Sequence, residues 1–69
     1  MQNLKITVNG SPMELSSGLT IAGLLDQLEV SGKMVAVEQN LEIVPKSEYD
    51  NRKIAADDTI EIVHFVGGG

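Results

Sequence analysis

The chain has 69 residues, a formal net charge of −5 and no cysteine, which indicates one small domain without disulfides, thiolate nucleophiles or thiolate metal sites. An acidic chain repels phosphate backbones, so we expect no nucleic acid among its partners, and a basic protein surface is the better complement. No apolar run approaches the length of a membrane span, so we expect no membrane association.

The first fifteen residues predict a β-hairpin. Apolar and polar residues alternate over residues 4–9, which is the period of a strand with one buried face. Asn9-Gly10 follows, a dipeptide that tolerates positive φ at both positions of a tight turn. Residues 12–15 form the return strand, and Pro12 at its start suits an edge. The N-terminus has no basic region followed by an apolar core, so we expect no signal peptide and a cytoplasmic protein.

A short amphipathic helix is predicted next. Thr20 is a suitable N-cap, and the apolar residues after it fall at i, i+3, i+4 and i+7. They form one stripe on a helix: Ile21, Leu24, Leu25 and Leu28. A helix of about nine residues is unstable alone in water, so we expect it to pack this stripe onto a sheet. Residues 30–32 end it.

The second half of the chain predicts three more strands. Residues 34–38 and 41–44 are short apolar runs, separated by a turn at Gln39-Asn40. Residues 46–53 are polar and predict a loop with one helical turn, after which residues 54–55 return to the core. Residues 59–66 form the last and longest strand.

The element order β-β-α-β-β-β predicts an α+β fold with the β-grasp, or ubiquitin-like, architecture. A strand that follows a helix must cross over to reach the sheet, so the helix covers one face of a mixed sheet of four or five strands. We expect the last strand to lie centrally, beside the first. Residues 1–66 then form the domain, and residues 67–69 form a flexible glycine tail.

Side chains that carry catalysis or bind metals are sparse. His64 is the one histidine, and we interpret it as a strand residue that helps to position the tail; a Ser-His-Asp arrangement depends on geometry and stays open. The closest acidic pairs are Asp57-Asp58 and Glu48/Asp50, which lack the spacing of an EF-hand. We interpret them as solvated turn carboxylates, and we predict no metal, no cofactor and no enzymatic activity.

The end of the chain offers a different kind of functional group. Gly67, Gly68 and Gly69 form a thin thread that spans at most roughly 10 Å and ends in a carboxylate, which another protein's active site can receive. The alternative interpretations are a frayed terminus or a cloning remnant.

The strand before the tail predicts a partner surface. Ile60 and Ile62 are expected to face the helix. If the alternation continues, Val63 and Phe65 form an apolar patch on the open face, and Val66 returns to the helix face. The alternative is a bulge that reverses this parity and places Phe65 in the core.

These features resemble the sulfur carrier proteins of thiamin (thiazole) biosynthesis, the ubiquitin-like ThiS family. The resemblance covers essentially the whole chain. It is carried by the Asn9-Gly10 hairpin, by residues 42–45 followed by Glu48 and Tyr49, and by residues 60–66 with the glycines after them.

The resemblance implies a chemistry for the tail. In this family an adenylating (E1-like) activating enzyme adenylates the terminal glycine carboxylate with ATP. Sulfur from a persulfide donor replaces the adenylate, and the resulting thiocarboxylate gives its sulfur to thiazole synthase. By position, Gly69 is the modified residue, and Gly67 and Gly68 give access to it. The partner-binding residues are on the last strand: Val63, Phe65 and Val66.

Other functions share the same features. The small subunit of molybdopterin synthase has the same fold and glycine end, although those chains are usually longer. A protein-conjugating ubiquitin-like modifier would join Gly69 to a lysine through an isopeptide bond. A plain interaction module with an idle tail is the remaining alternative.

Overall fold

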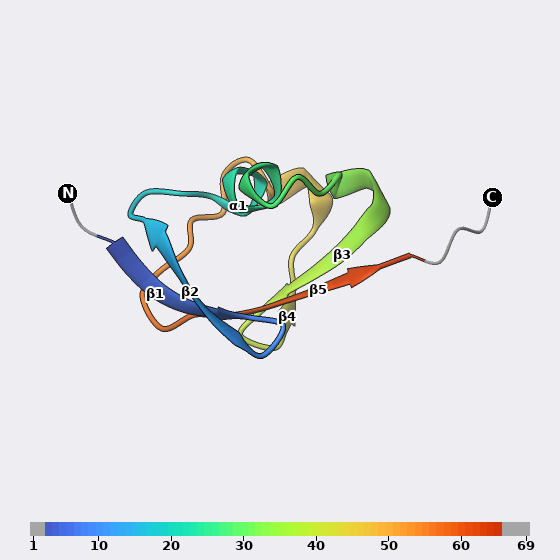
Figure 1. The fold of residues 1–69 in the computed structure, drawn as a ribbon. Coiled ribbons are helices and arrows are strands. Elements are labelled where there is room, and N and C mark those ends of the chain that lie inside the picture. Colours follow the sequence, from blue (N-terminus) through green and yellow to red (C-terminus); the bar gives the residue numbers. More distant parts are fainter. Residues whose placement is uncertain (1–2, 66–69) are drawn as a thin grey trace.

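The computed structural model describes residues 3–65, which form a five-stranded sheet with one α-helix on one face (Figure 1). The helix is α1 (Ile21–Gln27), and two 3-10 turns are η1 (Gly32–Met34) and η2 (Lys46–Glu48). The strands are β1 (Asn3–Val8), β2 (Ser11–Ser16), β3 (Val35–Gln39), β4 (Glu42–Ile43) and β5 (Thr59–His64). The sheet order β2-β1-β5-β3-β4 places β5 centrally, parallel to β1 and antiparallel to β3. This confirms the predicted α+β, β-grasp fold.

The β1–β2 hairpin forms as predicted. Asn9 and Gly10 have φ values of 49° and 82°, the left-handed conformation that this turn requires at both positions. Pro12 lies on β2, which is an edge strand of the sheet, so its missing N–H removes no hydrogen bond from the interior of the sheet.

Helix α1 begins at the predicted residue. The Thr20 hydroxyl accepts a hydrogen bond from the Gly23 N–H at 3.2 Å, which satisfies one of the free donors of the first turn. A Cβ at Gly23 would lie 2.6 Å from Leu19 Cδ2, so the glycine makes room for Leu19. The helix ends at Gln27, one residue before the predicted end of the stripe.

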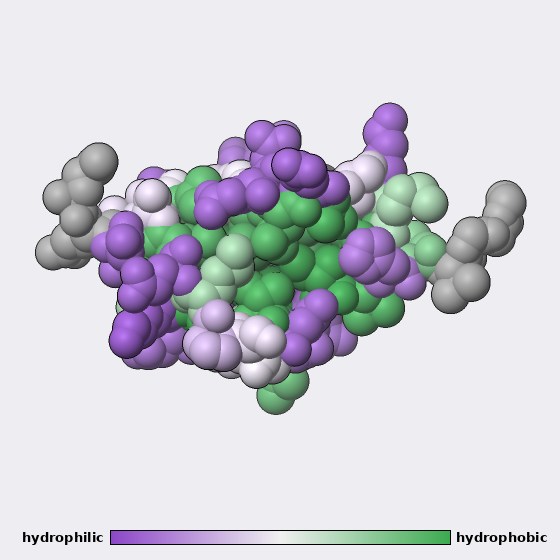
Figure 2. Space-filling model, in the orientation of Figure 1, coloured by the Kyte–Doolittle hydropathy of each residue, from purple (hydrophilic) through white to green (hydrophobic). Residues whose placement is uncertain are grey.

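The core lies between α1 and the sheet. Figure 2 shows apolar residues gathered in a band between these two layers. The core consists of twelve buried hydrophobic residues from both layers and the loops: Ile6, Leu15, Ile21, Leu24, Leu25, Val35, Val37, Val44, Tyr49, Ile54, Ile60 and Ile62. Within residues 3–65, no helix is both long enough and apolar enough to cross a bilayer.

Strand β4 is shorter than predicted. The turn before it is Asn40-Leu41, with φ values of 53° and 70°, and not Gln39-Asn40, because Gln39 still belongs to β3. Leu41 is 86% exposed, so this leucine occupies a left-handed turn position without packing in the core. Strand β5 has six described residues, as β1 and β2 do, so it is not longer than they are within the part that the structure describes.

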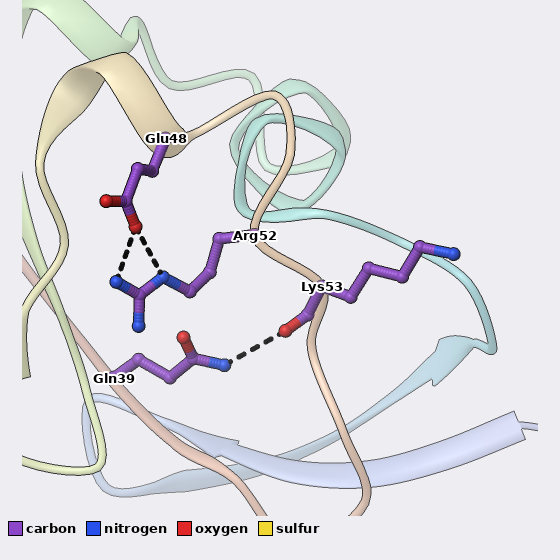
Figure 3. Close-up of polar contacts among 4 residues, drawn as sticks. All are labelled: Gln39, Glu48, Arg52 and Lys53. Carbon is purple, nitrogen blue, oxygen red and sulfur yellow. Dashed lines mark hydrogen bonds and ion pairs between the residues drawn. The ribbon is translucent and has the colours of Figure 1, made fainter.

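The polar segment after β4 is more ordered than a plain loop. It contains the predicted helical turn, η2, and it closes over the start of α1, where the Ile21 N–H donates to the Arg52 carbonyl at 2.9 Å and the Ala22 N–H to the Tyr49 carbonyl at 2.8 Å. Arg52 also pairs with Glu48 at 2.6 Å (Figure 3). The hydrogen bonds from Ile21 and Ala22 satisfy backbone N–H groups that the start of a helix leaves free.

Two side-chain predictions in this segment had different outcomes. Ile54 returns to the core as predicted, but Ala55 is exposed, so that prediction was wrong. The Tyr49 ring is buried, which the polar sequence around it did not indicate. Burial raises the pKa of the Tyr49 hydroxyl, and a backbone hydrogen bond at Val37 offsets part of that rise.

Candidate functional site

The register of β5 decides which of its side chains reach solvent. Ile60 and Ile62 are buried under α1, whereas Val63 is 57% exposed and Phe65 is 51% exposed. The pairing with β3 runs without a bulge from Ile60 to His64, and the Phe65 N–H then donates to the Met34 carbonyl at 2.9 Å. The predicted exposure of Val63 and Phe65 is therefore confirmed, and Phe65 is not part of the core.

Apolar residues gather on the open face of β3, β4 and β5. Val63 is directly opposite Ala36 on β3, and both point away from α1 because Val35, Val37 and Ile62 point toward it. On β4, Ile43 is opposite Glu38 on the same face and is 73% exposed. We call Ala36, Ile43 and Val63 the open-face patch. Exposed apolar groups gathered in this way are typical of a partner surface.

Phe65 lies at the end of this surface and has its own contact. Lys46 reaches across from η2, and its Nζ atom lies 5.2 Å from the centroid of the Phe65 ring. The same ammonium donates a hydrogen bond to the Lys33 carbonyl at 3.1 Å. A cation over an aromatic face contributes about 0.5–1 kcal/mol at an exposed site. Lys46 therefore helps to orient the last described residue before the tail.

Asn9 fastens the other side of β5. The β1–β5 ladder ends where the Asn9 N–H donates to the Ile60 carbonyl at 2.9 Å. Beyond that point the Asn9 side chain continues the ladder: its Oδ1 accepts from the Ile62 N–H at 2.7 Å, and its Nδ2 donates to the Ile62 carbonyl at 3.2 Å. β5 is thus held by β3 on one side and by β1 with Asn9 on the other, up to the residue before Val63.

Asp58 corrects one prediction from the sequence. It is not a solvated turn carboxylate but a buried one, and it accepts hydrogen bonds from Gln39 at 2.7 Å, Asn40 at 2.9 Å and the Ala55 N–H at 2.8 Å. Burial raises the pKa of Asp58, but these three hydrogen bonds outweigh burial and leave its pKa below the usual value. Gln39 also donates to the Lys53 carbonyl at 3.2 Å (Figure 3), so the network joins β3 to the segment before β5.

The other candidates in the sequence do not form a reactive centre in the described residues. His64 is exposed at the end of β5, opposite Val35, and its ring makes no hydrogen bond or ion pair within residues 3–65. No group of three or more His, Cys, Asp or Glu residues lies close enough to hold a metal ion in that part of the chain. Val66, Gly67, Gly68 and Gly69, and with them the predicted boundary between domain and tail, lie outside the described residues.

Comparison with known proteins agrees with this geometry. The model of the ThiS family matches residues 6–69. The chain belongs to the ThiS family. The crystal structure of a thiamine biosynthesis protein (ThiS) from Geobacter metallireducens superimposes on this ThiS-family chain with a TM-score of 0.83 and 32% identity, covering 96% of this chain and 100% of the other.

Two relatives extend the comparison. The sulfur carrier protein ThiS of Bacillus subtilis is 48% identical over 50 residues, which cover 72% of this chain and 76% of the other. A thiazole synthase from Paramagnetospirillum magneticum is 46% identical over 66 residues, which cover 96% of this chain and 20% of the other. The chain therefore spans about a fifth of the length of the thiazole synthases that it matches.

Proposed function

We propose that this ThiS-family protein is a sulfur carrier for formation of the thiazole of thiamin, and that its working group is the carboxylate of Gly69. The observation that carries this proposal is the family match, which extends to residue 69 and so includes all three glycines. In this role the protein is a substrate of its partner enzymes and has no catalytic activity of its own.

The chemistry follows from the poor reactivity of a carboxylate. An activating enzyme joins the Gly69 carboxylate to the AMP portion of ATP and releases pyrophosphate, which gives the acyl group a good leaving group. The terminal sulfur of a persulfide then attacks the carbonyl, AMP leaves, and reduction by a thiol releases the thiocarboxylate. Glycine leaves the carbonyl unhindered, and Gly67 and Gly68 let the thread enter a narrow active site.

The structure supports a rigid base for such a tail. Strand β5 is the central strand of the sheet and ends at one end of the molecule (Figure 1). Because both sides of β5 are hydrogen-bonded, a partner that grips the exposed side chains near its end also fixes where the tail begins. Val63 and Phe65 are exposed there, and we propose them, together with Val66, as the docking residues.

Thiazole synthase is the proposed acceptor of the sulfur. The thiazole synthases from two bacteria contain a segment that is 46% and 42% identical to this chain over 66 residues. A segment similar to this chain within the same polypeptide as a thiazole synthase supports a functional link between the two. The activating enzyme and the persulfide donor follow from the family chemistry.

Intact-mass analysis tests the proposal. The protein is incubated with ATP, the activating enzyme of the same organism and a persulfide donor, and we expect exchange of one oxygen for sulfur at the C-terminus. Deleting Gly69, or adding one residue after it, should abolish the exchange and leave the circular dichroism spectrum unchanged. Normal sulfur transfer in either variant would overturn the mechanism, and lysine adducts in extracts would favour a protein-conjugating modifier instead.

A further inference from the structure

Two glutamates of like charge are direct cross-strand neighbours on the open side of the sheet. Glu38 on β3 and Glu61 on β5 are direct partners in the antiparallel register. Their side chains lie on the face away from α1, because their neighbours Val37 and Ile62 are buried on the face that α1 covers. Directly opposite residues have Cβ atoms about 4.5–5.5 Å apart, and like charges in such a pair are destabilising.

Nothing in the described part of the chain neutralises this pair. Within residues 3–65 the ion pair at 4.0 Å or less is Arg52–Glu48. Two lysines lie on this side of the sheet: Lys5 of β1 is opposite Glu14, and the Lys46 ammonium is held over Phe65 and by the Lys33 carbonyl. Since Thr7 is opposite Thr59 on the parallel strand, Lys5 and Glu61 are offset by four residues, or about 13 Å along the strands. The isolated domain therefore keeps an uncompensated charge pair in the middle of its sheet.

The acidic pair adjoins the open-face patch. Ile43 is the neighbour of Glu38 on β4, and Val63 follows Glu61 by two residues on β5, so apolar side chains flank the carboxylates on two sides. Both glutamates are already partly buried. A protein that covers Ile43 and Val63 must also cover Glu38 and Glu61. Burying two unpaired carboxylates is strongly unfavourable unless a cation accompanies them.

We propose that the activating enzyme binds this face and places an arginine side chain between the carboxylates of Glu38 and Glu61. A guanidinium is planar and has five donors, so it can bond to two carboxylates at once, which an ammonium does less well. The net charge of −5 favours the encounter with a basic surface. This inference rests on the proposed function.

The activating enzyme is chosen over thiazole synthase for a physical reason. In the relatives from two bacteria, the matching segment is part of the thiazole synthase chain itself. A tether raises the effective concentration of the two parts, so little intrinsic affinity is needed between them. In those relatives the activating enzyme must still find the carrier segment by diffusion, so it is the partner for which a specific and charged surface on this type of domain matters most.

Neutral variants test the proposal: Glu38→Gln, Glu61→Gln and the double variant. At about 0.1 M salt we expect each single change to raise the Kd for the activating enzyme by about tenfold, as the loss of one charged partner in a desolvated contact predicts. The double change should raise the Kd by less than the product of the two single-variant factors, because both carboxylates share one guanidinium. The rate of adenylation at saturating carrier should stay unchanged.

The matched control is Glu42→Gln. It removes the same charge from the same sheet, but its side chain is on the opposite face because it alternates with Ile43. Its Kd should change less than twofold. In the absence of enzyme, Glu38→Gln and Glu61→Gln should unfold at a higher urea concentration than wild type, because the repulsion between the two carboxylates is removed. This result would show that weaker binding of these variants is not caused by a damaged fold.

Each outcome bears on a separate claim. Equal Kd values for wild type and the double variant, with wild type adenylated normally, would overturn the arginine contact and leave the carrier function standing. Failure of wild type to be adenylated at all would overturn the carrier function itself. Weaker binding to thiazole synthase, with binding to the activating enzyme unchanged, would show that the face belongs to the other partner and would overturn the assignment made here.

Discussion

Asn9 offers the sharpest test of how β5 is held. Its side chain makes two hydrogen bonds to the backbone of Ile62, a residue 53 positions away, and its own backbone is left-handed with φ of 49°. Replacement by glycine keeps that conformation and removes both bonds. Replacement by alanine removes both bonds and also adds left-handed strain. The pair of variants therefore separates the hydrogen bonds from the conformational preference.

The expected magnitudes follow from these contacts. Two partly buried hydrogen bonds contribute about 1 kcal/mol each, and glycine adds about 0.5–1 kcal/mol of chain entropy in the unfolded state. Asn9→Gly should therefore lower the free energy of unfolding by about 2–3 kcal/mol. Asn9→Ala exchanges that entropy term for about 1–2 kcal/mol of strain, which gives about 3–4 kcal/mol. Small domains have total stabilities near the lower end of about 5–15 kcal/mol, so either loss is large.

Urea denaturation measures both variants. With a slope of about 1 kcal/mol per molar urea, as expected for a small domain, the midpoint of Asn9→Gly should fall by about 2–3 M. Hydrogen exchange gives the local readout: the Ile62 amide should lose more protection than the Ile60 amide, which bonds elsewhere. A fall in stability of less than about 0.5 kcal/mol for Asn9→Gly would refute the argument, because it would show that water replaces the amide side chain without cost.

Two further residues give predictions of opposite sign. Asp58→Asn should lower the free energy of unfolding by about 1–3 kcal/mol at neutral pH, because one oxygen must replace two as acceptors of three hydrogen bonds. Folding lowers the pKa of Asp58, so the Asp58 carboxylate stabilises the fold above its unfolded pKa of about 4, and this stabilisation is lost as the pH falls through the folded pKa. The free energies of unfolding of wild type and Asp58→Asn should therefore converge in acid. A difference between them that does not depend on pH would contradict this reasoning. Leu41→Gly should raise the free energy of unfolding by about 0.5–1 kcal/mol in urea titrations, because left-handed strain outweighs the added chain entropy, and a loss of stability would show that this side chain packs on the domain.

The periodic elements were predictable because their signals are local. Alternation in residues 4–8 and 59–62 and the spacing from Ile21 to Leu28 each reflect one buried face, which the structure confirms. The exposure of Val63 followed from continuing the same alternation. The turn at Asn9-Gly10 was predictable because the required backbone angles belong to few residue types.

The features that escaped prediction depend on contacts between distant residues. Leu41 does not resemble a turn residue, so the sequence predicts the β3–β4 turn one residue too early. Asp58 is predicted to be solvated because its partners, Gln39 and Asn40, are 19 and 18 positions away. Tyr49 lies in a polar segment, and its burial depends on where η2 packs. The Asn9-Gly10 dipeptide indicates the turn but not the hydrogen bonds from Asn9 to β5, because no local pattern in the sequence determines the register of β1 against β5.

The residues that destabilise the isolated sheet are not evenly distributed over it. On the β1–β2 side the open face pairs Lys5 with Glu14, as stability alone would favour. On the β3–β5 side it pairs Glu38 with Glu61 among exposed apolar residues, and the adjoining turn strains Leu41. Single substitutions at these surface positions would remove the charge repulsion or the backbone strain without altering the core. Local rules that are broken together on the β3–β5 side of the sheet, and kept on its β1–β2 side, indicate a surface suited to a partner and not to the isolated fold.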